Sequence, residues 1–356
     1  MFGRNFMYVS TRYAPLRFQP TSSSIHPLVV FRYDFDNGGF GDCIKGMVAT
    51  MQIAALAGCD FRVDFSRHPF GTALPLAYGI ADIRKVPEDR IFNIIDWLTS
   101  SNRRSIRDKL LVELANGSLG AVGSVTAIQS NMAMSHELAS AMNVSIASVV
   151  GIASQAMRSL YERVFDGGAL GTFWPGSSGP CFRIAVHLRE GDQFITHAIF
   201  NKNDSRVYDK DAMLLALKNV VDVAKRIAPP GSKLVTFVCG DTMQAREQLR
   251  MVLTEHFLVV SAPESPVHIG YRAILDIFGT EHAGRAARDT VREHHTLASA
   301  DAIFMLSYSG FSLSACSIGA AGGRVNASLP RCFVHTDRGN WEQTDPVKIN
   351  MLSPGT

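Results

Sequence analysis

Hydrophobic and polar positions alternate along the chain in two patterns. Short apolar runs bounded by glycine, proline or polar residues predict buried strands, and longer stretches with apolar residues at helical spacing predict helices. The first half predicts a strand at 27–33, a glycine-rich turn at 34–42, a helix at 43–57 that Gly58 ends, and a strand at 61–65. This order of strand, turn, helix and strand is one βαβ unit.

The same alternation returns after residue 180. Strands are predicted at 183–188, 233–239, 257–260, 302–306 and 331–335, and helices at 209–227, 242–253, 290–298 and 312–319. Continuous apolar strands separated by helices indicate a parallel sheet that is covered on both faces. Between these two regions the pattern is weaker, with a short element at 91–98 and packing helices at 104–114 and 135–161.

The clearest change of composition is a stretch rich in glycine, proline and serine at 166–180, where we place a domain boundary. The predicted organisation is a lead-in at 1–26, an N-terminal domain at 27–165, a linker at 166–180, a C-terminal domain at 181–345 and a tail at 346–356. A chain of 356 residues is long enough for two domains that each have a core. We therefore expect an α/β protein in which two Rossmann-like parallel-sheet domains face each other across a cleft.

Composition and charge exclude several classes of protein. Hydrophobic residues at 46% and charged residues at 19% are typical of a globular chain and not of a disordered one. The net charge of +3 is small and no basic stripe occurs, so we expect no nucleic-acid partner. The six cysteines lack C-x-x-C spacing, which favours buried free thiols over disulfides or a zinc site. Without a membrane segment or secretory signal, the expected location is the cytoplasm, or the Golgi or ER lumen if the N-terminus is incomplete.

Polar residues gather where the strand at 183–188 ends. His187, Arg189, Glu190 and Asp192 follow one another there. In open α/β sheets ligands bind off the carboxyl ends of the strands, and a planar guanidinium binds the oxygens of a diphosphate in pairs. These residues are therefore candidates for an anion site. The alternative is a strand-end arginine that pairs with a neighbouring carboxylate.

The glycine-rich turn Gly39-Phe-Gly-Asp42 lies between the first predicted strand and helix. Glycine lets the backbone approach a ligand closely, and a helix N-terminus favours anionic groups. The alternative is an ordinary turn. Asp34-Phe-Asp36 has the D-x-D spacing of a metal site but no third ligand, and aspartate is a common turn former. His294-His295 also lacks a third ligand, so we interpret it as a polar helix pair and expect no metal.

Four motifs occur in a consistent order between about residues 30 and 335. They are Gly39-Phe-Gly-Asp-Cys-Ile-Lys-Gly-Met47, Val186-His-Leu-Arg189, Phe237-Val-Cys-Gly-Asp241 and, after the strand at 302–306, Ser309-Gly-Phe-Ser312. Together they resemble the GDP-fucose-dependent fucosyltransferases, a group that includes the rhizobial nodulation fucosyltransferase, the α1,6-fucosyltransferases and the protein O-fucosyltransferases. No motif is specific alone, and their order and structural context give them weight.

The resemblance implies a GT-B type fold and a set of roles. Arg189 is expected to hold the diphosphate of GDP-fucose, His187 to lie near the guanine and Asp241 to lie in the nucleotide pocket. The remaining substrate-binding candidates form two groups. The group that is expected to cap a phosphate is Ser309, Gly310, Phe311 and Ser312. The group that opens the acceptor-side domain is Gly39, Phe40, Gly41 and Asp42. The implied partners are GDP-fucose as donor and a glycan or glycoprotein as acceptor, with no cofactor.

Three positions depart from the family pattern, of which Gly240, where relatives have a threonine, is a mild change. Many relatives carry two adjacent arginines, whereas the second position here is Glu190, so phosphate binding would depend on Arg189 and backbone amides. The α1,6 enzymes have a catalytic carboxylate eight residues past the first arginine, and the same distance here reaches His197. A neutral imidazole can take a proton from a hydroxyl, although His197 is equally interpretable as a polar loop residue. Glu190 and Asp192 are further candidates for the base.

The functional hypothesis is inverting transfer of fucose from GDP-fucose to a hydroxyl group, without a metal. The altered base position keeps an alternative open, a catalytically silent relative that binds a nucleotide or a glycan. A third hypothesis, a nicotinamide dehydrogenase, is weakened because the G-x-G-x-x-G fingerprint and the ribose-binding carboxylate are missing.

Overall fold

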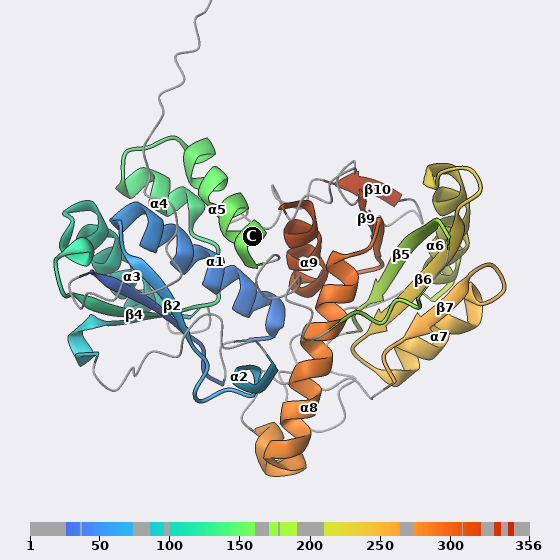
Figure 1. The fold of residues 1–356 in the computed structure, drawn as a ribbon, viewed down its shortest axis with the longest axis horizontal. Coiled ribbons are helices and arrows are strands. Elements are labelled where there is room, and N and C mark those ends of the chain that lie inside the picture. The colour runs from blue at the N-terminus through green and yellow to red at the C-terminus, as the bar shows by residue number, and fades with distance from the viewer. Residues whose placement is uncertain are drawn as a thin grey trace, which may run out of the picture.

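The structure is a computed structural model that describes residues 26–35, 38–73, 86–95, 100–160, 171–176, 179–190, 210–263, 273–307, 309–321, 331–335 and 341–344. Within these ranges each half of the chain forms one sheet with its own helices, and helices α8 and α9 stand between the two sheets (Figure 1). None of the described helices combines the length and the hydropathy that crossing a bilayer requires.

The first half forms a four-stranded parallel sheet with the strand order β2-β1-β4-β3. Its strands are β1 (Leu28–Arg32), β2 (Asp60–Asp64), β3 (Ile91–Ile94) and β4 (Val125–Ser130). Its helices are α1 (Phe40–Ala57), α2 (Phe70–Ala73), α3 (Ser100–Ala115), α4 (Ser135–Ala141) and α5 (Ile146–Leu160), with the 3₁₀ turns η3 (Glu88–Arg90) and η4 (Ser118–Gly120). Gly58 ends α1 in the left-handed conformation, as its position in the sequence predicts.

The second half forms a six-stranded sheet with the order β10-β9-β8-β5-β6-β7, in which only the edge strand β10 is antiparallel. Its strands are β5 (Cys181–Leu188), β6 (Lys233–Gly240), β7 (Leu258–Ser261), β8 (Ala302–Met305), β9 (Arg331–His335) and β10 (Trp341–Thr344). Its helices are α6 (Lys210–Ile227), α7 (Met243–Leu253), α8 (Ala273–Ala298) and α9 (Gly310–Ala321). The α/β class with two Rossmann-like parallel sheets is therefore confirmed.

Several predicted elements need correction. The sequence predicts no strand at β4, because the polar residues Thr126 and Gln129 interrupt its apolar run, yet it is a central strand whose residues from Thr126 onward are buried. The single helix predicted at 135–161 is two helices, separated near Asn143, whose φ of 49° is left-handed. Asparagine tolerates this conformation better than most residues, which explains a break at this position.

The largest hydrophobic core joins the two halves. It contains fully buried side chains from both sheets, including Phe31 of β1, Phe237 of β6 and Ile303 of β8. Helices α1 and α5 pack on α9, and α2 packs on α8 (Figure 1). The expectation of a separate core for each half is wrong on this side of the C-terminal sheet, because residues 312–319 of α9 are all buried and the helix packs on elements of both halves. A second core covers the other face of that sheet.

Residues 171–176 lie within the predicted linker and are bound to the C-terminal half. The Phe173 ring stacks on Phe237 at 5.7 Å with an interplanar angle of 4°, and the Arg292 guanidinium lies 4.0 Å from the centre of the Phe173 ring. The Trp174 indole N–H donates to Ser299 Oγ at 2.8 Å. This part of the connection is therefore packed against α8 and β6, and the domain boundary itself stays a prediction.

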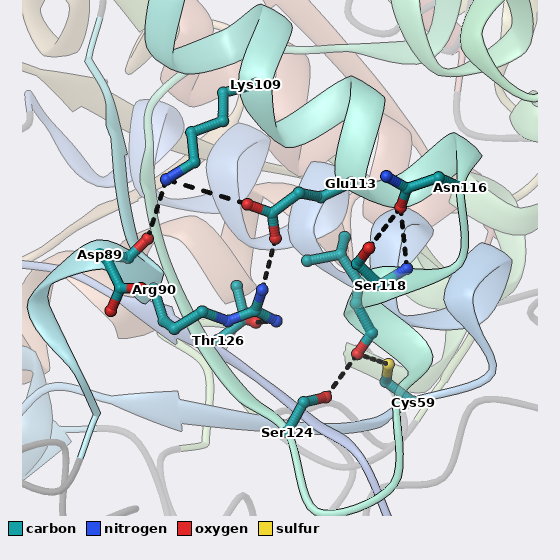
Figure 2. Close-up of polar contacts among 10 residues, drawn as sticks. Cys59, Asp89, Arg90, Lys109, Glu113, Asn116, Ser118, Ser124 and Thr126 are labelled. Atoms are coloured by element: carbon teal, nitrogen blue, oxygen red, sulfur yellow. Dashed lines mark hydrogen bonds and ion pairs between the residues drawn. The ribbon is translucent and has the colours of Figure 1, made fainter.

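A polar network closes the amino-terminal edge of the first sheet (Figure 2). The Arg90 guanidinium donates to the Glu113 carboxylate of α3 and, at 2.7 Å, to the hydroxyl of the fully buried Thr126 in β4. This network explains why β4 can contain a buried polar residue, since the hydroxyl is satisfied. It lies at the opposite end of the strands from the candidate site and has a structural role.

Candidate functional site

The strand order of the second sheet fixes where a ligand is expected. From β5 the chain continues to β6 and β7 on one side, and then crosses to β8 and β9 on the other side. The order therefore reverses between β5 and β8, and in open α/β sheets ligands bind in the crevice outside the carboxyl ends of the strands at such a point. The same reasoning places the reversal of the first sheet between β1 and β4.

Arg189 and Ser307 close this switch point. The Arg189 backbone N–H donates to Ser307 Oγ at 2.9 Å, and the Ser307 hydroxyl donates to the Arg189 carbonyl at 3.0 Å. The Leu306 N–H donates to the His187 carbonyl, which continues the strand pairing to this point. The backbone from which the Arg189 guanidinium extends is therefore fixed at the position where the fold favours a ligand.

The N-terminus of α9 lies beside this pair. Ser309 precedes the helix, and its hydroxyl accepts the Phe311 N–H at 3.3 Å in the manner of an N-cap. His187 Nδ1 forms a short hydrogen bond of 2.5 Å with Ser312 Oγ, and both side chains are buried. His187 therefore contacts the first turn of α9, where the amide groups favour an anion. Its position near a guanine stays a prediction.

The predicted turn Gly39–Asp42 proves to be the beginning of α1. Gly39 is the N-cap, and Asp42 Oδ2 accepts the Gly39 N–H at 3.3 Å, which satisfies a group at the helix end. The buried Tyr33 hydroxyl donates to the carbonyls of Gly38 and Gly39. Burial raises the pKa of Tyr33 well above its ordinary value, so the phenol stays protonated and remains a donor.

The two groups of substrate-binding candidates from different halves of the chain are in direct contact. A Cβ atom placed on Gly41 would lie 2.4 Å from the Gly310 carbonyl carbon and 2.5 Å from the Phe311 nitrogen. The first turns of α1 and α9 thus meet backbone to backbone, which only glycine at position 41 permits. Two helix N-termini and Arg189 bring positive potential to one region, a combination that suits a phosphate or diphosphate.

Lys45 belongs to this contact, and the sequence did not identify it. Its Nζ lies 2.6 Å from Asp42 Oδ1, and a Cβ on Gly310 would lie 3.6 Å from the same Nζ. The available signal was its position three residues after Asp42, on the same face of the helix.

Glu190 and Asp241 tie the ends of β5 and β6 together. The Glu190 N–H donates to Asp241 Oδ1 at 2.9 Å, while the Glu190 carboxylate accepts the Thr242 hydroxyl. Thr242 is also the N-cap of α7 and accepts the Ala245 N–H at 2.9 Å. Because its carboxylate supports this cap, Glu190 is less suited to act as a base than the sequence suggested. Its catalytic role stays a prediction.

A buried ion pair lies against the carboxyl end of β6. The Arg246 guanidinium donates to Glu293 Oε1 at 2.7 Å and to the Gly240 and Ala262 carbonyls at the ends of β6 and β7. The Cys239 thiol donates to the other Glu293 oxygen at 3.2 Å. Burial raises the pKa of Glu293 and of Cys239, so this thiol is not a reactive thiolate. The sequence could not reveal the pair, since Arg246 resembles an ordinary surface residue of a helix.

His294 is buried where the halves meet, contrary to its interpretation as part of a polar helix pair. Its ring centre lies 4.9 Å from that of Phe40 and 5.1 Å from that of Phe311, and Nε2 lies 2.9 Å from Ser314 Oγ. Burial, with a smaller contribution from His295, lowers the pKa of His294 to about 3. The imidazole is therefore neutral near pH 7 and contributes to packing.

Three predicted residues fall outside the described part of the chain: Asp36, Asp192 and His197. Asp34 Oδ2 lies 3.8 Å from Arg32 and 3.7 Å from Arg67. Across the described ranges, no group of three or more histidine, cysteine, aspartate or glutamate side chains is arranged to hold a metal ion.

No family model and no curated protein matches the chain. The fucosyltransferase NodZ from Bradyrhizobium is 15% identical, with 90% of this chain and 99% of that chain covered and a TM-score of 0.47. A NodZ α1,6-fucosyltransferase crystallised with GDP is 17% identical, with coverage of 90% and 98% and a TM-score of 0.46. FUT1 of Arabidopsis thaliana in complex with GDP is 12% identical, with coverage of 88% and 72% and a TM-score of 0.44. These three similar structures are all fucosyltransferases, the group that the motifs of this chain resemble, and at such identities and TM-scores the likeness leaves the function to be argued from the site.

Proposed function

We propose that this chain is a fucosyltransferase that takes GDP-fucose as donor and transfers fucose, with inversion, to a hydroxyl group of a glycan or glycoprotein. The observation that carries the proposal is the Arg189–Ser307 pair at the switch point, set beside the joined N-termini of α1 and α9. A fixed guanidinium and two sets of helix amides suit a diphosphate. The order of the four motifs supports guanosine and fucose over other nucleotide sugars.

The proposed roles follow the development of charge. When the bond between fucose and GDP breaks, negative charge grows on the departing diphosphate, and Arg189 with the α9 amides would stabilise it most at that moment. His187 would keep the first turn of α9 in place through Ser312. Asp241 would contribute to the nucleotide pocket, beside the cap formed by Glu190 and Thr242.

Inversion requires a base that takes the proton of the attacking hydroxyl. We assign this role to His197, because an imidazole titrates near the operating pH. The proposed reaction uses no metal. The Glu190 carboxylate accepts the Thr242 hydroxyl, so it is engaged in the α7 cap and less suited to act as a base. This observation favours a second candidate function, a silent relative that binds GDP-fucose without transfer.

A thermal-shift comparison of GDP, UDP, ADP and NAD tests the donor. We expect GDP alone to raise the melting temperature, because a ligand at one hundred times its Kd stabilises the folded state by about 2.7 kcal/mol. The Arg189→Ala variant should lose this shift, whereas Arg250→Ala, which removes an exposed guanidinium from α7, should retain it. Stabilisation by NAD instead of GDP, or an unchanged response of Arg189→Ala, contradicts the proposal.

Turnover separates the enzyme from its silent relative. The purified chain is incubated with GDP-fucose, alone and with a panel of glycan and glycoprotein acceptors, and released GDP is measured. Release that depends on an acceptor supports the transferase. Tight GDP binding without release in every condition supports the silent relative.

A further inference from the structure

Lys45 places a positive charge at the contact between the two halves. Its ammonium group lies on the first turn of α9, because both Cε and Nζ are 3.6 Å from the point where a Cβ on Gly310 would be. The lysine itself belongs to α1, in the other half of the chain. Its side chain is 24% exposed, so the ammonium is neither fully buried nor fully solvated.

The charges around Lys45 are unusual for a purely structural ion pair. A helix N-terminus repels a cation, and here two N-termini meet beside one. Asp42 holds the ammonium at 2.6 Å, but this pair is partly exposed, and such pairs contribute little to stability. The Asp42 carboxylate also caps α1 through the Gly39 N–H. A second anion could therefore engage Lys45 while Asp42 kept its capping bond.

The charge of a diphosphate exceeds what Arg189 alone can neutralise. The position next to Arg189 is Glu190, whose carboxylate is bound to Thr242 and adds no positive charge. Lys45 is the ammonium that the described structure places against the α9 N-terminus, where the diphosphate is proposed to bind. A lysine acts as a compact point charge on phosphate oxygens and needs no paired geometry.

We propose that Lys45, which comes from the opposite half of the chain to Arg189, is the second phosphate-binding cation of this site. This inference rests on the proposed donor site. Binding of the diphosphate would then depend on the contact between α1 and α9, because Lys45 and Arg189 come from opposite sides of it. Any change that separates the two helices would then weaken donor binding without touching Arg189.

Titration calorimetry of GDP and of inorganic pyrophosphate against the full chain tests this inference. We expect Lys45→Met to lower the affinity for both ligands about tenfold or more, because a charge-assisted hydrogen bond is lost. Lys45→Arg should stay within about threefold of the parent chain, since it retains the charge. Lys225→Met removes the same charge from an exposed position on α6 and should leave both affinities unchanged. The affinity of Lys45→Met should also depend less on salt.

Each result decides a different point. An unchanged GDP affinity in Lys45→Met, with the parent chain binding normally, overturns the role of Lys45 and leaves the donor proposal standing. A loss for GDP with none for pyrophosphate also overturns it, because Lys45 would not act on phosphate. Binding of pyrophosphate through Lys45 without binding of GDP keeps the cation site and refutes the choice of nucleotide. A parent chain that ignores both ligands refutes both proposals. Circular dichroism and melting curves confirm that the variants are folded.

Discussion

Replacing Gly41 by alanine adds a single atom, the Cβ, at the contact between the two halves. The new Cβ would lie 2.4, 2.5 and 2.6 Å from three backbone atoms of Gly310 and Phe311. Ordinary carbon contacts begin near 3.4 Å, so the first turns of α1 and α9 must move apart by about 1 Å. Backbone atoms cannot rotate out of the way as a flexible side chain can. The strain therefore falls on the packing between the halves.

Two opposing effects set the size of the change. Alanine favours a helix interior over glycine by about 0.5–1 kcal/mol. Overpacking a close contact costs about 1–3 kcal/mol. The clash should win, because it involves backbone on both sides, and we expect a net loss of about 1–2 kcal/mol in the free energy of unfolding. The affinity for GDP should fall as well, since the phosphate-binding groups lie on both sides of the contact.

Melting curves and GDP titration of three glycine variants check this reasoning. Gly41→Ala should melt below the parent chain. Gly310→Ala should be tolerated, because its Cβ would meet Lys45 only at 3.6 Å, an ordinary contact. Gly151→Ala, on the exposed face of α5 with nothing within 4 Å, should melt higher through helix propensity alone. If Gly41→Ala matched Gly151→Ala in stability and kept full GDP affinity, the direct contact of α1 with α9 would be refuted.

Two further predictions concern buried titratable side chains. Folding favours the neutral form of His294, so its contribution to stability is complete above its unfolded pKa of about 6.5 and is lost as the pH falls towards 3, by roughly 2 kcal/mol at pH 5. The His294→Gln variant should therefore show a smaller drop in melting temperature than the parent chain between pH 7 and pH 5. An equal drop in both contradicts the assignment. The Arg246→Met variant leaves Glu293 buried without its cation and should lower the free energy of unfolding by about 3–5 kcal/mol, measured by denaturant unfolding. The double variant with Glu293→Met should recover part of this loss. A double variant that is no more stable than Arg246→Met argues against the pair.

The sequence predicted the elements with strong periodicity and missed features that depend on packing from elsewhere. The helix α1 begins three residues before the sequence pattern predicts, because Gly39 and Gly41 lower the local helix propensity. The Asp42 cap and the close approach of α9 compensate, and neither is visible in the local pattern. The strand β4 was not predictable from its own residues, because its buried Thr126 needs a hydrogen-bond partner and that partner, Arg90, lies far away in the sequence.

The candidate site was predictable in part for the same reason. Arg189, Asp241 and Ser309 follow apolar strands, so their position at one edge of a parallel sheet follows from the chain alone. Lys45 and Arg246 lie on helices, where a charged residue gives no sign of what packs above it. Their roles depend on contacts between elements far apart in sequence, which periodicity cannot supply.

The packing of α1 and α5 on α9, and of α2 on α8, has a consequence for dissecting the protein. If the halves were produced as two polypeptides, the first would leave α1 and α5 uncovered and the second would leave α8 and α9 uncovered. Each fragment would then aggregate by itself, while co-expression would let them find each other and reconstitute one particle. Fragment complementation, rather than isolated domains, is the route by which the two sheets of this protein can be studied apart.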